Sequence, residues 1–394
     1  MKHIFILLSI IILASSDLFS QDTDMILGEV EKNNTTLIAL RKSADAERIG
    51  NKTGLYPENP EFAFNYLWGS PESIGNRKDI SLMQSFDFPS AYVYRNQISE
   101  YRNEQVELEY ERQHKSIVTH TRLICNGLTY HNALKNELRR RIENAGKVAD
   151  SYKSSFEIGE TGIIDFNKAQ VYLLNIIKDA ESNEIERNAL LAELQNLNGG
   201  IAVQFTDSVF PLQVTELDFD HWYIHAEQNN PVLKWLKQEI SISRKNEKLN
   251  TAMGLPRFQT GYMSEDVIGQ QFQGITVGLA IPLLENKNAV KYAKAKTIAV
   301  QSAETDTRLQ FYNNLKALHT KAISLQNSLN DYRTNLQKFS NSDLLLKALD
   351  HGALSLAEYY YELSVFYESL NKLLVLEKTL NETVIELNRY QEMP

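Results

Sequence analysis

The feature that most constrains this chain is a stretch of roughly 70 residues, Leu283 to His351, that contains neither glycine nor proline. Within it, apolar residues step alternately by four and three positions, which is the spacing of a coiled-coil seam. They are Phe311, Leu315, Leu318, Ala322, Leu325, Leu329, Tyr332, Leu336 and Phe339. Because an α-helix rises about 1.5 Å per residue, this helix is expected to be roughly 100 Å long, which no compact domain requires.

The chain contains a second region of this kind, and the two halves repeat each other. Ser90–Phe156 contains only Gly127 and Gly146, and its apolar residues follow the same steps. The segment Gly162–Asp165 is echoed by Gly352–Ser355 about 190 residues later, in keeping with a repeat of this length. Several such matches in the same order indicate duplication of a unit about half the chain long.

The duplication predicts the following organisation. The first repeat, 21–200, has a helix, a β-hairpin at 61–89, a long helix at 90–157 and a return helix at 165–198. The second, 231–394, has a helix, a hairpin at 256–282, a long helix at 283–351 and a return helix at 355–390. Residues 201–230 are expected to form an irregular equatorial belt. Gly162 and Gly352 suit left-handed helix ends, Asp165 and Ser355 suit N-caps, and Ser355 with Glu358 spells a capping box.

The first 20 residues are predicted to be a cleavable signal peptide. Lys2 precedes an apolar run from Ile4 to Ala14, and small and polar residues follow. Cleavage is expected between Ser16 and Gln21, and no cysteine follows the run to carry a lipid anchor. The protein is therefore expected to be exported.

Composition and motifs argue against several classes of function. The net charge of −9 disfavours nucleic acid as a partner, and a single cysteine, Cys125, excludes an intrachain disulfide or a cysteine-rich metal site. No phosphate loop, zinc-protease motif or nucleophile elbow is present, so we expect neither an enzyme nor a cofactor. His221 and His225 have the spacing of a helical metal pair, but surface histidines are the preferred reading, and we expect no metal site.

The hairpins alternate in a way that suits membrane-crossing strands, with aromatic and aliphatic residues on one face. We expect the following residues to face lipid: Phe62, Phe64, Tyr66, Trp68, Ile80, Leu82, Phe86, Phe88, Ile275, Val277, Leu279 and Ile281. The other reading of this face is one side of a soluble sandwich. Four strands leave two unpaired edges, which lipid does not tolerate. Three copies give twelve strands around a lumen, whereas in two copies side chains fill the interior.

In this architecture the chain resembles the TolC family of outer-membrane efflux channels. The similarity is carried by Asn59–Phe62, Ser85–Pro89, Ala280–Leu284 and the two glycine-led turns. The aromatic first hairpin and Gln84–Pro89 are most similar to the heavy-metal-efflux branch. The resemblance implies a mainly α-helical protein with long antiparallel helical hairpins forming an α-barrel in the periplasm. It also implies a homotrimer with a 12-stranded β-barrel in outer-membrane lipid, a periplasmic adaptor (membrane fusion protein) and an inner-membrane pump of the resistance–nodulation–division type.

The resemblance also suggests site residues. The turns distant from the strands are the expected adaptor-docking tips: Gly159, Glu160, Thr161, Gly162 and Ile163, and His351, Gly352, Ala353 and Leu354. Glu358 and Tyr361 occupy positions of the periplasmic gate. The alternatives are that both tips are only capped turns and that Glu358 only serves its capping box. Tyr359, Tyr360 and Tyr361 are expected to pack and hydrogen-bond between helices rather than to form a ligand cage.

The resulting hypothesis is a passive exit duct of a tripartite efflux system, which conducts substrates from adaptor and pump to the outside. The competing hypothesis is a periplasmic coiled-coil scaffold or adaptor without a membrane barrel. That alternative does not account for two hairpins with alternating aromatic faces. The exported substrate, a heavy metal or a drug, is not encoded in these patterns.

Overall fold

The computed structural model of the chain describes residues 21–212, 216, 218–338 and 342–390. The predicted signal peptide and the seam residue Phe339 lie outside the described residues. The chain divides into two compact units. The first unit comprises the described parts of Met1–Ile38, Gln113–Asn229 and Tyr312–Pro394, and the second comprises Ala39–Arg112 and Asn230–Phe311.

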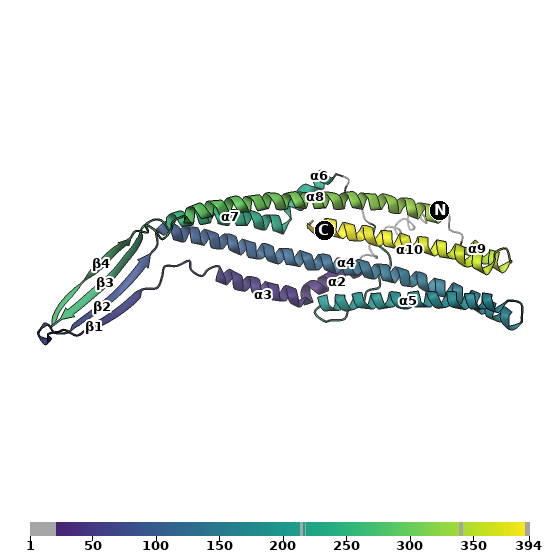
Figure 1. Cartoon of the computed structure of the whole chain (residues 1–394), viewed down its shortest axis with the longest axis horizontal. Helices are drawn as coiled ribbons and strands as arrows, with labels where there is room; N and C mark the ends of the chain where they lie inside the picture. Colours follow the sequence, from purple (N-terminus) through teal and green to yellow (C-terminus); the bar gives the residue numbers. More distant parts are fainter. Residues whose placement is uncertain (1–20, 213–215, 217, 339–341, 391–394) are drawn as a thin grey trace, which may run out of the picture. The chain divides into compact units, whose positions relative to one another are not determined.

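The order of helices and strands repeats along the chain (Figure 1), which confirms a mainly helical fold with an internal repeat. The first repeat has helices α2 (Gln21–Asn33) and α3 (Thr35–Gly50), strands β1 (Glu61–Leu67) and β2 (Arg77–Phe86), and helices α4 (Pro89–Glu157) and α5 (Ile163–Leu197). The second has α6 (Phe219–Gln228), α7 (Pro231–Ala252), β3 (Arg257–Val267), β4 (Gln270–Ala280), α8 (Ala289–Lys338), α9 (Ser342–Asp350) and α10 (Leu356–Leu387). Short 3₁₀ turns are η1 (Glu72–Ile74) and η2 (Asn388–Tyr390).

The four strands form one antiparallel sheet in the order β1-β2-β3-β4. The central pairing, β2 with β3, joins the hairpin of the first repeat to that of the second, from Arg77 opposite Val267 to Phe86 opposite Phe258. The second hairpin closes with a two-residue turn, Ile268-Gly269, in which both residues have positive φ. Such turns match the twist of paired strands. Strand β3 continues through Ser264–Asp266 as far as this turn.

Two predicted helix boundaries also differ from the structure. The left-handed residue after α4 is Gly159, with φ of 79°, whereas Gly162 has φ of −80° and is the N-cap of α5. Asp165 lies in the first turn of α5, where its carboxylate pairs with Lys168 3.1 Å away. In the second repeat the long helix begins at Ala289 rather than at residue 283, after Asn288 at φ of 67°.

The segment expected to be an irregular belt, 201–230, contains a helix. Residues 201–212 have no regular structure, but Asp218 caps α6 by accepting bonds from the amides of Asp220 and His221. The junction between α6 and α7 repeats the junction between α2 and α3. Asn34 accepts a bond from the amide of Leu37 at the start of α3, and Asn230 does the same for α7 through the amides of Val232 and Leu233. The second repeat therefore begins with α6, the counterpart of α2.

In the first unit, α5 returns antiparallel beside the later part of α4 (Figure 1), and a buried cluster fills the space between them. A second cluster contains Phe205 of the belt and residues from three helices: Ile26, Val30, Ile124, Cys125, Leu128 and Leu194. Cys125 is thus a small buried residue of this cluster.

In the second unit, the early part of α4 contacts α3 and α7 through polar side chains. Glu107 of α4 pairs with Arg41 at 3.0 Å and with Arg48 at 2.6 Å, and Gln105 donates to Glu239 of α7 at 2.9 Å. These contacts join the ends of the helices that lead into the sheet.

Candidate functional site

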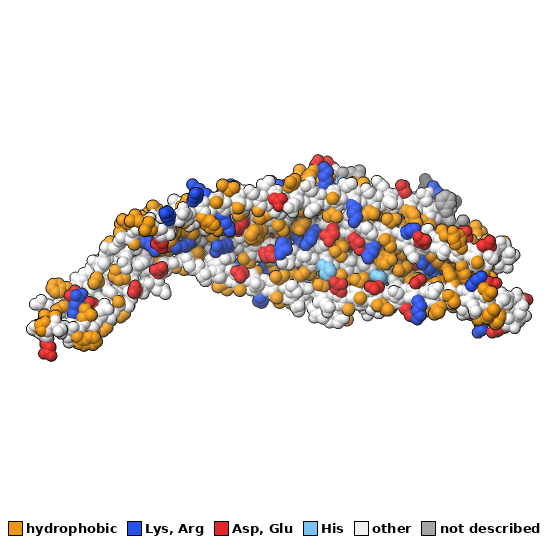
Figure 2. Space-filling view, in the orientation of Figure 1, with side chains coloured by type: hydrophobic (Ala, Val, Ile, Leu, Met, Phe, Trp, Pro, Cys, Tyr) orange, Lys and Arg blue, Asp and Glu red, His pale blue; other side chains and the backbone are white. Residues whose placement is uncertain are grey.

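The sheet has two chemically different faces, and its register defines them. Phe62 pairs with Leu82, Leu82 with Tyr262, and Tyr262 with Ile275, so these four side chains lie in one row on one face. We call this the apolar face. Its other large apolar residues are Phe64, Tyr66, Ile80, Phe86, Phe258, Val277 and Leu279. Most of them are exposed, Ile275 to 82%, whereas Tyr66 and Phe86 are partly buried, and Figure 2 shows hydrophobic side chains at the surface of the sheet.

Every strand residue that we expect to face lipid lies on the apolar face: Phe62, Phe64, Tyr66, Ile80, Leu82, Phe86, Ile275, Val277 and Leu279. Trp68, Phe88 and Ile281 lie just beyond the strand ends. Trp68 is 81% exposed and packs edge-on against Tyr66 with 5.5 Å between ring centroids. Phe88 lies beside Phe258, with ring centroids 6.3 Å apart.

The opposite face, which we call the polar face, carries mostly small, polar and charged side chains, together with the apolar residues Leu67, Met83, Met263, Val267 and Phe272. Its charged residues are Glu61, Arg77, Asp79, Arg257 and Glu265. The charged residues of the apolar face are Lys78 and Asp266, which lie opposite each other in the strand register near the hairpin turns. In the part of the chain that the structure describes, β1 and β4 each have one edge with no partner strand. Open edges of this kind present unpaired backbone groups to which a further strand can add.

At the helix end of the sheet, Asp87 is surrounded by basic groups. Its carboxylate lies 2.6 Å from Arg95 and 3.4 Å from Arg257, and Arg257 also reaches Glu285 at 2.9 Å. The backbone amide of Asp87 donates to the hydroxyl of Tyr92. The carboxylate of Asp87 is therefore neutralised by two arginines.

The first predicted docking tip is the turn between α4 and α5. The amides of Glu160 and Thr161 both donate to the carbonyl of Ser155, and Gly159 supplies the positive φ that this turn needs. Ile163 at the start of α5 is half exposed, which leaves apolar surface at the tip.

The second tip, His351–Leu354, connects α9 to α10. Gly352 has φ of 70°, and the amides of Ala353 and Leu354 both donate to the carbonyl of Ala348. Ser355 and Glu358 form the predicted capping box, which is confirmed. Hydrogen bonds from the backbone and hydroxyl of Ser355 lower the pKa of Glu358, so its carboxylate stays ionised at neutral pH.

Both tips belong to one packed region of the first unit. The helical hairpin of α4 and α5 packs against α10. The buried residues of this contact are Val148, Ala149 and Ala169 on the hairpin and Leu356, Tyr359 and Leu363 on α10. Tyr172 stacks on Tyr360 with ring centroids 3.8 Å apart, whereas Tyr361 is 67% exposed. Burial raises the pKa of Tyr359 to about 12. A groove of about 500 Å³ lies along this region, lined from α4 and α9 by residues that include Lys147, Ser151, Ser155, Leu346 and Leu349.

Arg141 was not singled out by its sequence pattern, although it is among the most buried charged residues here. It is 6% exposed, lies 4.3 Å from the ring of Tyr367 and donates to Asn371 at 2.9 Å. Burial lowers its pKa from the ordinary value. Since α4 and α10 lie in different repeats, this contact ties the two helical hairpins of the first unit together.

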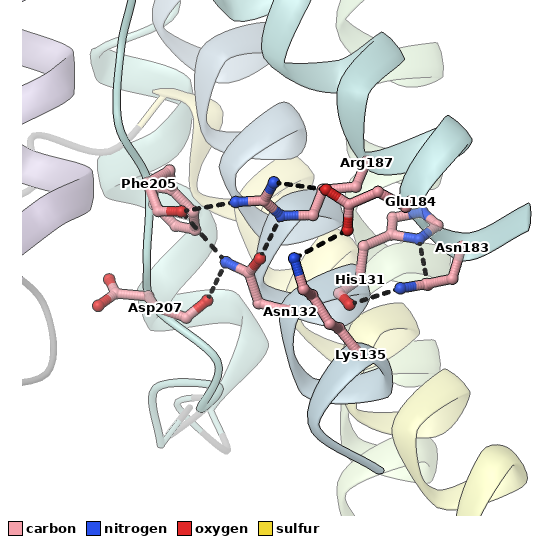
Figure 3. Close-up of polar contacts among 8 residues, drawn as sticks. All are labelled: His131, Asn132, Lys135, Asn183, Glu184, Arg187, Phe205 and Asp207. Atoms are coloured by element: carbon pink, nitrogen blue, oxygen red, sulfur yellow. Dashed lines mark hydrogen bonds and ion pairs between the residues drawn. The ribbon is translucent and has the colours of Figure 1, made fainter. Parts of the chain in front are cut away.

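The belt is anchored to α4 and α5 by a polar cluster (Figure 3). Asn132 donates to the carbonyls of Phe205 and Asp207 at 3.3 and 2.9 Å and accepts a bond from Arg187 at 2.6 Å. Arg187 also pairs with Glu184, which reaches Lys135 at 2.9 Å. Beside them, His131 and Asn183 exchange two bonds. The phenyl ring of Phe205 packs in the apolar cluster with Ile26, Val30 and Leu128, so the segment is held by both its backbone and its side chain.

The remaining histidines and the cysteine form no metal site among the described residues. His221 and His225 face each other with ring centroids 5.4 Å apart, and His221 also contacts Glu216 at 2.9 Å. Among the same residues, no helix has the length and apolar character needed to cross a membrane.

Comparison with known proteins places this architecture. No protein-family model and no curated protein matches the chain. Solved structures do match. The structure of CusC matches at 14% identity, and the alignment covers 94% of this chain and 92% of CusC with a TM-score of 0.79. The outer-membrane channel OprN matches at 11% identity over 94% and 89%, with a TM-score of 0.78. The Campylobacter jejuni CmeC outer membrane channel matches at 14% over 94% and 85%, with a TM-score of 0.74. The chain therefore has the fold of the TolC-family outer-membrane channels, the family that its sequence resembles.

Proposed function

We propose that this protein is an outer-membrane channel that acts as the passive exit duct of a tripartite efflux system. The observation that carries the proposal is the sheet: one exposed apolar face, one charged face and two open edges, in the fold of solved outer-membrane channels. An antiparallel sheet of this kind can sit in lipid only when it closes with other copies.

Three copies close the sheet into a 12-stranded barrel, with β1 of one copy beside β4 of the next. The apolar face then contacts outer-membrane lipid, and the polar face lines the lumen. Trp68 and Phe88, beyond the two ends of the strands, suit the membrane–water interfaces. Two copies would give an eight-stranded barrel whose interior side chains leave no duct.

The first unit supplies the partner contacts in this proposal. The tips at Gly159–Ile163 and His351–Leu354 dock a periplasmic adaptor, with an inner-membrane pump of the resistance–nodulation–division type behind it. Exposed apolar residues at the first tip and the groove beside α9 support this role. Glu358 and Tyr361 narrow the periplasmic mouth, and adaptor contact shifts the population from closed to open. The exposed ring of Tyr361 and the ionised carboxylate of Glu358 are available for that role.

Export through a signal peptide at residues 1–20 and residence in the outer membrane complete the proposal. Heavy-metal ions or drugs are the expected cargo. A periplasmic scaffold without a barrel is the competing function, and the exposed apolar face argues against it, because such a face is unfavourable in water.

Two neighbouring substitutions on β4 test the proposal. Ile275→Arg places a charge on the apolar face, where it should cost about 2–4 kcal/mol at mid-membrane and reduce insertion. Thr276→Arg places the same charge on the polar face and should be tolerated. The purified wild-type and Thr276→Arg trimers should conduct in planar lipid bilayers and fractionate with outer membranes. A folded wild-type trimer without conductance, or equal loss of insertion in both variants, would rule out the duct.

A further inference from the structure

On the polar face, close to the hairpin turns, one arginine bridges two carboxylates from neighbouring strands. Asp79 of β2 and Glu265 of β3 are directly opposite each other in the register. The guanidinium of Arg77 lies 2.7 Å from Asp79 and 3.3 Å from Glu265. Like charges directly opposite in a sheet repel each other, so Arg77 compensates a repulsion that the register imposes.

The position of this triad separates it from the other charges of the sheet. Arg77 begins β2 and Glu265 lies two residues before the end of β3, so the triad sits at the turn end of the polar face. At the helix end, the charge of Asp87 is already balanced by Arg95 and Arg257. The triad holds two acids and one base, which leaves one negative charge that its own members do not compensate.

We propose that Arg77, Asp79 and Glu265 form the charge-selecting ring of the duct, in which Arg77 sets how strongly the lumen prefers cations. The inference rests on the proposed function, since three copies must close for three triads to form one ring. The ring then carries a net charge of about −3, in the manner of charged side-chain rings that select ions in other pores.

The sheet provides an internal control for this assignment. Lys78 follows Arg77 directly but lies on the apolar face, opposite Asp266 in the strand register. Removing either positive charge changes the net charge of the chain by the same amount at nearly the same height in the sheet. Only the loss of Arg77, however, exposes two carboxylates to the lumen.

The experiment measures the cation-to-anion permeability ratio of purified trimers in planar bilayers under a potassium chloride gradient. Arg77→Gln should raise the ratio about fourfold, because three charges roughly 10 Å from the ion at 0.1 M salt raise the local cation concentration about twofold and lower the local anion concentration by about the same factor. Glu265→Gln should lower the ratio by a similar factor. Lys78→Gln should leave it within experimental error of the wild type.

The outcomes separate the ring from the duct itself. Equal shifts of the permeability ratio in Arg77→Gln and Lys78→Gln would overturn the ring and leave the duct intact. The same holds if the trimer conducts but neither Arg77→Gln nor Glu265→Gln changes that ratio. A wild-type trimer that does not conduct at all would overturn the proposed function and the ring with it. Glu265→Gln keeps the test decisive if Arg77→Gln fails to assemble, because its expected shift has the opposite sign.

Discussion

Replacing Phe205 by alanine should detach the belt from the first unit at a measurable cost. Phe205 is 1% exposed and packs against Ile26, Val30, Leu128 and Leu194. Removing a buried phenyl ring costs about 3–5 kcal/mol, since the lost burial and the remaining cavity both count. Val209→Ala in the same segment is the matched control, because Val209 is exposed and its truncation should change stability by no more than about 0.5 kcal/mol.

The polar half of the anchor gives the second arm of the experiment. Asn132→Ala removes two bonds to belt carbonyls and one from Arg187, and it leaves the partly buried guanidinium with fewer acceptors. This change should cost about 2–3 kcal/mol. Because Asn132 bonds the backbone of Phe205 itself, either change alone loosens the same segment, and the double variant should cost about 1–2 kcal/mol less than the sum.

Two measurements follow the belt in the detergent-solubilised protein. Urea unfolding monitored by far-ultraviolet circular dichroism gives the free energies, and native-state hydrogen exchange reports the amides of residues 201–212. Both single variants should speed exchange across that segment, whereas Val209→Ala should not. A cost below about 1.5 kcal/mol for Phe205→Ala, or strict additivity in the double variant, would refute the reasoning that one anchor holds the belt.

Three further predictions concern single positions. Gly199→Ala should destabilise the protein by about 2 kcal/mol or more, because φ of Gly199 is 66° and the new Cβ would lie 2.4 Å from a backbone oxygen of α2. Gly200→Ala is the control: φ of Gly200 is 86°, but the new Cβ would meet no atom within 4 Å, so the change should cost only about 1 kcal/mol. Glu358→Ala should speed amide exchange at the second tip, unlike Glu362→Ala. Since the pKa of Glu358 is lowered from 4.5, the wild type should show the same loosening as the pH falls below that value, after correction for intrinsic exchange rates. Tyr359 should ionise only near pH 12 in the folded protein, against 10 in the unfolded chain, so its contribution to stability should decline above pH 10. In ultraviolet titration, Tyr359→Phe should lack the ionisation step near pH 12.

The long helices and the hairpins are predictable because their signals are local. The absence of glycine and proline and the seam of apolar residues predict helix wherever they occur, and the structure has α4 at Pro89–Glu157. Likewise, the alternation of apolar and polar residues along β2 and β4 predicts which side chains lie on each face of the sheet. The capping box at Ser355 is a four-residue pattern and needs no tertiary information.

The errors arise where the sequence offers two equivalent choices. Gly159 and Gly162 are three residues apart, and composition does not say which one takes the positive φ. The positive φ of Ile268 is unfavourable for a branched side chain, so no sequence rule would place the turn there. The start of the second repeat, in contrast, had a usable signal: Asn229-Asn230 repeats Asn33-Asn34, and this dipeptide marks the joint in both halves.

The site residues that sequence reasoning missed depend on contacts between distant segments. Arg77 and Asp79 share a strand face by their spacing, but the placement of Glu265 opposite Asp79 follows only from the pairing of β2 with β3. The bonds from Asn132 to the belt likewise join residues more than 70 positions apart. A helix pattern predicts which face of the helix is buried. It does not predict which backbone carbonyl of a distant segment will lie against that face.

The two open edges of the sheet have a consequence for how the protein is made. In the proposed trimer, a newly made copy does not cover its aromatic surface by folding alone, so we expect folding and encounter with sister molecules to be a single event. The yield of correctly inserted protein should then depend steeply on copy number, and sparse expression should leave stranded monomers for proteolysis. In such a protein, the concentration of the chain belongs among the determinants of its native state as much as the sequence does.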